Sequence, residues 1–285
     1  AIRKSAITLR GDIVIACVVG ELQGGVGTVH ALNSGIKADM AIIAEPNGDD
    51  TILTVHSGWM EMAINVLGES MHIGRKEEGV DAIEKMIKVI RAINGLQLTH
   101  LPYPSLPRLP RIMVGGIIGG RGRDHILNGF NFNSDFCTAL VDARTVPGQT
   151  SDMVLADVRG VLEALREEDP DFRYEIECPP PAKFKALSIV MEAMDMPTDQ
   201  YIVHAVARNY EALTGKRPAT IGVKLPNSYS GNDTTHLWKA GIPCVLYGPV
   251  GNLFGEDDEA DSYVRISHME TCAKVIALTA LEVCA

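Results

Sequence analysis

The first part of the chain alternates between strand-like and helix-like patterns. A run of β-branched and other apolar residues, GDIVIACVVG (11–20), is bounded by glycines and predicts a fully buried strand. VGTVHALNSGI (26–36) predicts a short helix that ends near Gly35, and ADMAIIAEP (38–46) predicts a second buried strand that stops at Pro46. Two buried strands joined by a helix indicate a parallel sheet that is covered by helices.

The pattern changes from Trp59 onward. WMEMAINVLG (59–68) alternates like a half-exposed strand, and residues 79–93 predict a helix. The apolar stripe that we expect on this helix is Val80, Ile83, Ile87 and Ile90. A proline-rich connector and two strand-like runs, a helix over 150–168 and the strand FRYEIEC follow. The order β-α-β-β-α-β is that of a ferredoxin-like layer.

The last part of the chain returns to the first pattern. We expect helices over 185–195 and 200–214, a buried strand in GIPCVLYGP (241–249) and a final helix in HMETCAKVIALTALEVC. The sequence therefore predicts an α/β protein whose larger domain is discontinuous. The predicted division is 1–58 and 182–285 for the larger domain, and 59–181 for the domain inserted in it.

Charge and composition narrow the classes of function. The 285 residues include 26 basic and 36 acidic ones, a net charge of −10 that disfavours binding to nucleic acid. No apolar run reaches the roughly 18 residues that cross a bilayer, so we expect no membrane span. The six cysteines form no CxxC pair, which favours a reducing, cytoplasmic location over a zinc site or a disulfide framework.

Two acidic residues follow the two predicted buried strands. Glu21 comes directly after the first strand and Glu45 ends the second. Carboxylates at one sheet edge can bind a cation or divide the roles of base and metal ligand. On position alone, Glu21 could equally begin a solvated loop. The glycines after Glu21 lack the GK[ST] that a phosphate loop requires, so we do not expect nucleotide binding.

Five segments in order resemble the M20 family of metallopeptidases and amidohydrolases, which includes acetylornithine deacetylase, succinyl-diaminopimelate desuccinylase and carboxypeptidase G-type enzymes. These segments are GDIVIACVVGELQGGVGT, ADMAIIAEPNG, GESMHIGRKEEGVDAIEKM, VDARTVPGQTSD and GNDTTHLWKAGIPCVLYGPVG. The resemblance implies a zinc-peptidase-like, doubly wound and mostly parallel sheet with an inserted lid domain. It also implies a homodimer formed through the lid, and hydrolysis of a C–N bond in a small carboxylated substrate.

The resemblance also implies roles for single residues. Glu21 matches the general base that activates water, and Glu45 matches an acidic ligand of a divalent ion such as Zn, Mn or Co. His72 matches the lid histidine that polarises the substrate carbonyl in the partner's active site. Gly231 and Asn232 match a turn whose backbone N–H groups meet the substrate carboxylate.

Three arginines could contact an anionic substrate. Arg144, before the PGQT turn, either forms a salt bridge that holds the turn or binds the substrate carboxylate. Arg121 and Arg123 lie on a glycine-rich lid loop, GGRGRD. That loop is either simply solvated or a receptor for an anion.

The chain departs from the family pattern at two ligands of the second metal ion. Leu22 stands where the family has a Glu. Either Asp258 stands where the family has a His, or a local insertion separates the two patterns. The family's His-x-Asp motif and its bridging Asp precede the segment that matches AIRKSAITLRGD, so this chain supplies one metal ligand and is expected to be incomplete for activity alone. We expect one ion per subunit. Two alternatives stay open: a single-metal aminohydrolase acting on a small carboxylated, possibly aromatic, amine, and an inactive homologue that serves as a binding protein.

Overall fold

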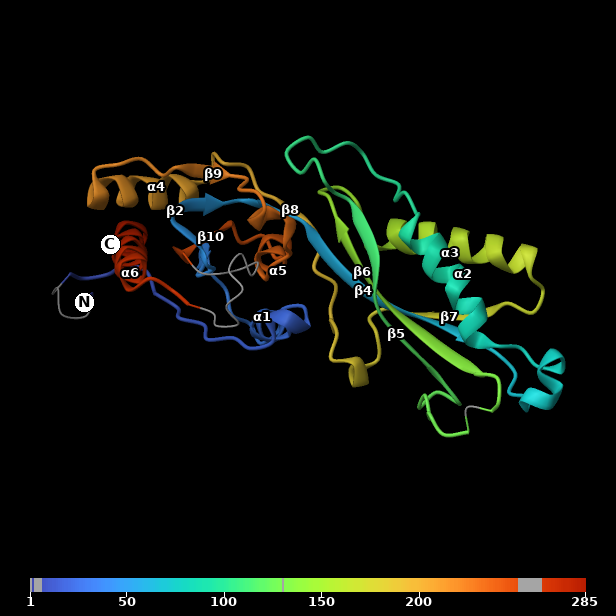
Figure 1. The fold of residues 1–285 in the computed structure, drawn as a ribbon. Helices are drawn as coiled ribbons and strands as arrows, with labels where there is room; N and C mark the ends of the chain where they lie inside the picture. The colour runs from blue at the N-terminus through green and yellow to red at the C-terminus, as the bar shows by residue number, and fades with distance from the viewer. Residues whose placement is uncertain (1, 3–6, 130, 251–262) are drawn as a thin grey trace. The chain divides into compact units, whose positions relative to one another are not determined.

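The computed structural model describes residues 2, 7–129, 131–250 and 263–285, which form two compact units. The first unit comprises 1–21, 25–57 and 193–285, and the inserted unit comprises 22–24 and 58–192. Figure 1 shows the helices and strands of each unit. The sequence predicts that 59–181 and the rest of the chain are separate domains, and this division stays a prediction.

The inserted unit is a four-stranded antiparallel sheet with two helices on one face (Figure 1). Its elements along the chain are β4 (Gly58–Leu67), α2 (Ala82–Asn94), β5 (Arg111–Gly120), β6 (Phe136–Thr145), α3 (Ser151–Glu168) and β7 (Arg173–Glu177). The strand order is β5-β6-β4-β7, so β4 is central and β5 and β7 are edges. This is the ferredoxin-like βαββαβ arrangement that the sequence predicts. As the central strand, β4 is mostly buried rather than half-exposed.

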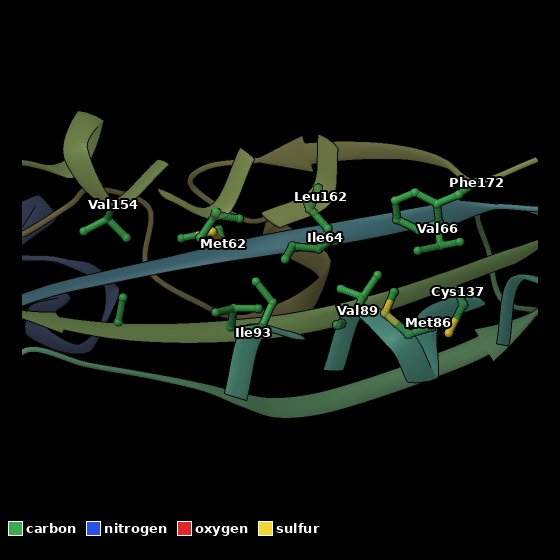
Figure 2. Packing of buried hydrophobic residues seen from close by; sticks show 14 of the residues in the cluster. Met62, Ile64, Val66, Met86, Val89, Ile93, Cys137, Val154, Leu162 and Phe172 are labelled. Atoms are coloured by element: carbon green, nitrogen blue, oxygen red, sulfur yellow. The ribbon is translucent and has the colours of Figure 1, made fainter. Parts of the chain in front are cut away.

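The helix α2 begins three residues later and ends one residue later than the predicted range 79–93, and it buries a different face. The Asp81 carboxylate caps the helix by accepting from the backbone N–H groups of Ile83 and Glu84, at 2.8 and 3.3 Å. Figure 2 shows the core that forms between the helices and the sheet. The α2 residues buried in it are Ala82, Met86, Val89 and Ile93. The predicted stripe is therefore wrong at Ile83 and Ile87, which are 40% and 45% exposed, while Ile90 packs against the core as predicted.

The first unit contains a four-stranded mixed sheet. Its strands are β1 (Ala41–Ile43), β2 (Asn47–Leu53), β9 (Thr220–Gly222) and β10 (Cys244–Val250), in the order β1-β10-β2-β9. The outer pairs are parallel and β10–β2 is antiparallel. Its helices are α1 (Val26–Asn33), α4 (Tyr201–Thr214), α5 (Thr234–Lys239) and α6 (Ile266–Cys284). Short β3 (Val55–His56) and β8 (Met194–Asp195) pair beside this sheet.

Two predicted elements are absent. Residues 11–20 are extended and exposed, with Ile15 at 85% and Val19 at 75%, and no strand of the described residues pairs with them. A β-branched run forms a strand only where a neighbouring edge accepts its hydrogen bonds. The helix expected over 185–195 is replaced by a segment that follows β4, because Met191 and Trp59 exchange backbone hydrogen bonds of 2.7 and 3.0 Å.

Candidate active site

Glu45 lies just after β1, in the turn that leads through Pro46 into β2. Its half-buried carboxylate forms a hydrogen bond with the Asn232 side chain. Burial raises the pKa of Glu45, the bond with Asn232 lowers it, and the nearby charge of Asp233 raises it again. The carboxylate is therefore held in surroundings that a bound cation would stabilise.

Gly231, Asn232 and Asp233 form a buried turn at the start of α5. Asn232 Oδ1 accepts from the backbone N–H of Thr234 at 3.1 Å, which fixes the amide that faces Glu45. Asp233 is 3% exposed. Its Oδ2 accepts from the Thr28 hydroxyl of α1, while Oδ1 makes no hydrogen bond within the described residues. The structure thus brings together Gly231, Asn232 and Glu45.

Glu21 is the first residue of a short 3₁₀ turn, η2 (Glu21–Gln23), that leads into α1. The backbone N–H of Gly25 donates to the carbonyls of Gly20 and Glu21 and so closes this turn. Gly25 has φ of +72°, and a Cβ there would lie 2.5 Å from Asp233 Oδ1. Only glycine therefore lets α1 begin against the Asp233 carboxylate. Glu21 is linked to the Glu45 region through α1 and the bond from Thr28 to Asp233, not by the end of a neighbouring strand as the sequence predicts.

His72 lies in the inserted unit, on the loop between β4 and α2. Its side chain is exposed, and Nδ1 accepts from the backbone N–H of Gly74 at 3.1 Å. In the neutral ring the proton is then on Nε2, which makes no hydrogen bond within the described residues. The imidazole also meets the Phe132 ring edge-on, with centroids 5.2 Å apart. This geometry presents Nε2–H as a donor for a carbonyl oxygen.

Arg144 is engaged within its own unit. Its Nε and Nη2 donate to the two carboxylate oxygens of Asp142 at 2.8 and 2.9 Å. Its guanidinium lies over the Trp59 ring at 4.3 Å, and Trp59 Nε1 donates to the same Asp142 at 2.8 Å. Arg144 therefore forms a salt bridge, but its partner Asp142 lies on the same strand and not in the PGQT turn. A role in substrate binding stays a prediction.

The described residues offer one of the ligands that a metal site needs. No group of three or more His, Cys, Asp or Glu side chains in the described part of the chain could hold an ion. Glu45 fits as a single ligand, because carboxylate oxygen binds divalent ions and the surroundings of Glu45 are already negative. Leu22 is 66% exposed and offers no electron pair. Asp258 lies outside the described residues.

Comparisons with known proteins agree with this arrangement. Residues 54–170, which lie mostly in the inserted unit, match the M20 peptidase dimerisation domain. The aminopeptidase PepT of Bacillus cereus has a TM-score of 0.66 to this chain at 17% identity, covering 93% of this chain and 63% of its own. The YXEP protein of Bacillus subtilis, a dinuclear metal binding peptidase from the M20 family, has a TM-score of 0.57 at 14% identity, with 90% and 61% covered. Residues 54–170 are therefore identified as an M20 peptidase dimerisation domain, and the chain as a whole is similar in fold to M20 peptidases.

A curated M20 relative adds a named reaction. The N-formyl-4-amino-5-aminomethyl-2-methylpyrimidine deformylase of Bacillus subtilis (strain 168) is 28% identical over 296 residues. The match covers 96% of this chain and 65% of the relative. This chain therefore spans less than two thirds of the length of the curated relatives it matches. No helix among the described residues is long and apolar enough to cross a membrane.

Sequence reasoning identified the turn itself but missed the contacts of Asp233 and two residues behind the turn, Thr28 and His56. Thr28 and Asp233 connect α1 to the turn, as described above. His56, 1% exposed, donates from Nδ1 to the Ser57 carbonyl at 2.8 Å and accepts at Nε2 from the Thr234 hydroxyl at 2.8 Å. The two threonines that follow Asp233 are a sequence signal for side-chain hydrogen bonds at this turn, because hydroxyls near the start of a helix commonly bond to nearby polar groups. Nothing in the sequence around His56 indicated its partner, which lies 178 positions away.

His56 makes folding of this chain sensitive to acid. Burial lowers its pKa from 6.5 to about 4, the Ser57 carbonyl acts in the opposite direction, and the nearby charge of His236 lowers it further. The unfolded chain takes up a proton as the pH falls below 6.5, while folded His56 stays neutral until about pH 4. Stability therefore falls as the pH drops through this window, by about 3 kcal/mol in total.

We expect His56→Gln to remove that part of the pH dependence. Urea unfolding at pH 7, 5.5 and 4 gives the free energy of unfolding of each protein, and its slope against pH is compared between wild type and variant. The carboxylates titrate in both proteins, so the difference in slope reports His56. His204→Gln, at an exposed position on α4, is the matched control and should keep the wild-type slope. Equal slopes for wild type and His56→Gln would contradict the assignment.

Proposed function

We propose that the intact protein is a metal-dependent amidohydrolase that cleaves the C–N bond of a small carboxylated substrate. The observation that carries this is the Glu45 carboxylate, which is paired with Asn232 beside Asp233 in a chain that also contains an M20 peptidase dimerisation domain. The relatives support the same chemistry, because the deformylase and the aminopeptidase are named for cleaving amide or peptide bonds.

Each candidate residue has a distinct task in this proposal. A divalent ion held by Glu45 and by ligands outside the described residues would supply Lewis acidity to the amide carbonyl and to water. Glu21 removes a proton from the attacking water and returns it to the leaving nitrogen. His72 of the other subunit donates its Nε2–H to the developing oxyanion. The backbone of Gly231 and Asn232 receives the substrate carboxylate.

The activity of the intact protein tests the proposal. We would supply Zn²⁺, Mn²⁺ or Co²⁺ and assay N-formyl amines, N-acyl amino acids and dipeptides, with and without a chelator. The expected result is turnover that requires the ion and yields an amine and a carboxylate. Release of ammonia without a carboxylate would instead indicate an aminohydrolase. No turnover on any substrate would favour the inactive homologue.

We propose further that the protein acts in the cytoplasm as a homodimer. All six cysteines are free, which agrees with a reducing compartment. The edge strand β5 pairs with β6 and exposes Ile117, at 52%, on the same face of the sheet as Gly119, because their partners on β6 are Ala139 and Cys137. Ile83 of α2 lies beside this strand, because a Cβ on Gly119 would be 2.7 Å from Ile83 Cγ1. An apolar surface that continues from an edge strand onto a helix is suited to pairing with a second copy.

Ile117→Lys should therefore convert the dimer to a monomer. A charge in the centre of a self-complementary interface occurs twice and is costly to bury. Sedimentation of the intact protein at micromolar concentration measures the change. Leu101→Lys is the matched control, since Leu101 is 80% exposed in the same unit and lies outside β5 and α2. A wild-type protein that sediments as a monomer would contradict the proposal.

A further inference from the structure

Asp233 contacts the helix that follows Glu21 and belongs to the turn that bonds to Glu45. Within the turn, Asn232 forms the hydrogen bond with the Glu45 carboxylate. Asp233 Oδ2 accepts from the Thr28 hydroxyl of α1, and a Cβ on Gly25 would be 2.5 Å from Asp233 Oδ1. These contacts place α1 and α5 side by side in the first unit (Figure 1). Asp233 therefore connects the turn beside Glu45 to the start of α1.

The backbone of Glu21 is joined to the start of α1 by hydrogen bonds. The N–H of Gly25 donates to the carbonyls of Gly20 and Glu21 at 3.0 and 3.2 Å. The N–H of Gly27, in the first turn of α1, donates to the Val19 carbonyl at 3.0 Å. Since these bonds join the segment that ends at Glu21 to the helix, a displacement of the start of α1 displaces Glu21 as well.

The position of α1 depends on its contact with Asp233. Thr28 is the one buried residue of this eight-residue helix, and its hydroxyl is the group that bonds to Asp233. A helix of this length is marginal without tertiary contacts. The Asp233 carboxylate is 3% exposed and lies at the N-terminal end of the helix, where the helix dipole and the Thr28 hydroxyl stabilise its negative charge. The charge and the hydrogen bond therefore fix where α1 begins.

We infer that Asp233 is the positioning residue for Glu21 and acts through Thr28 and the start of α1. The inference rests on the proposed function, in which Glu21 takes a proton from the attacking water. Because Asn232 and Asp233 are consecutive, a single turn sets the positions of the metal ligand Glu45 and of the base. A displacement of about 1 Å between such groups can cost a hundredfold in rate. Asp233 itself neither exchanges a proton nor binds the ion.

Kinetics of Thr28 variants in the intact protein test the inference. Thr28→Val removes the hydroxyl and keeps the shape of the side chain. It should lower kcat about 10- to 100-fold and leave KM and metal content unchanged, because a misplaced base slows only the chemical step. Thr28→Ser keeps the hydroxyl and should keep the wild-type kcat. Thr279→Val is the matched control, since Thr279 is 1% exposed in the same unit and its hydroxyl makes no hydrogen bond within the described residues.

A double variant separates positioning from a general loss of structure. If Thr28 affects catalysis through Glu21, Thr28→Val should lower kcat by no more than about twofold in protein that already carries Glu21→Gln. Losses that multiply in the double variant would overturn the inference. If Thr28→Val does not fold, Thr28→Ala replaces it with the same expectations, because a water molecule can then hydrate the Asp233 carboxylate without joining it to α1.

Amide hydrogen exchange separates this inference from the proposed function. The Gly25 N–H closes the turn that carries Glu21, and its exchange is followed by NMR in the intact protein. Exchange in Thr28→Val should be at least about tenfold faster than in wild type, Thr28→Ser and Thr279→Val, because the start of α1 then opens more often. If that pattern appears without turnover of any substrate, the proposed function fails and the connection from Asp233 to the Glu21 turn stands. If turnover is present but Gly25 exchanges equally in all four proteins, the function stands and the connection is wrong.

Discussion

Glu21→Gln in the intact protein is expected to lower kcat about a thousandfold and to leave the metal content unchanged. Glutamine keeps the size and the hydrogen-bonding capacity of the side chain but cannot take a proton from water. The turn that carries Glu21 should persist, because it is closed by backbone bonds from Gly25 to Gly20 and Glu21. The loss should therefore appear in kcat, with KM little changed.

A matched variant shows whether the effect is specific to this position. Glu270, on α6 of the same unit, is paired with Lys274 on its own helix at 2.7 Å. Glu270→Gln removes one carboxylate and should change kcat less than twofold, because surface pairs of this kind contribute little to stability. If Glu21→Gln retained its ion and full turnover, Glu21 would not be the base, and another carboxylate near Asn232 would take that role.

The inserted unit was predictable because its signals are local. Asp81 caps α2 and Thr150 caps α3 within three residues, and the βαββαβ order follows from the sequence of elements alone. Which face of α2 is buried was not predictable. Ile83 and Ile87 are more apolar than Ala82 and Met86, yet the direction of the sheet decides which stripe meets the core.

The candidate site was predictable only in part. Glu45 and Asn232 were identified from separate motifs, and their contact depends on a fold that joins positions 187 apart. Asp233 belongs to the same motif as Asn232, but its hydrogen bond with Thr28 has no sequence signal, because the two residues lie 205 positions apart. Residues 11–20 show the opposite error, since their composition predicts a strand while hydrogen-bonding partners decide whether one forms.

The intact protein should hold one tightly bound divalent ion per subunit, and Glu45→Ala should lose it. Alanine removes the carboxylate that faces Asn232, so binding should weaken at least a hundredfold, more than the loss of a residue that only supports a ligand. A second ion is not expected, because Leu22 has no donor atom where the family supplies a carboxylate. The M20 relative YXEP is dinuclear, so this chain would differ from it in metal content.

Elemental analysis after dialysis measures both expectations on the same samples. Glu192→Ala is a suitable control, because Glu192 is half-buried like Glu45 but belongs to the inserted unit, and it should retain the wild-type content. Two tightly held ions per wild-type subunit would show that another residue replaces the missing donor at Leu22. An unchanged single ion in Glu45→Ala would show that the site lies elsewhere. We expect Glu45→Ala to lose the ion and Glu21→Gln to keep it. That result would show that Glu45 binds the metal and that Glu21 does not, as a metal ligand and a general base should differ.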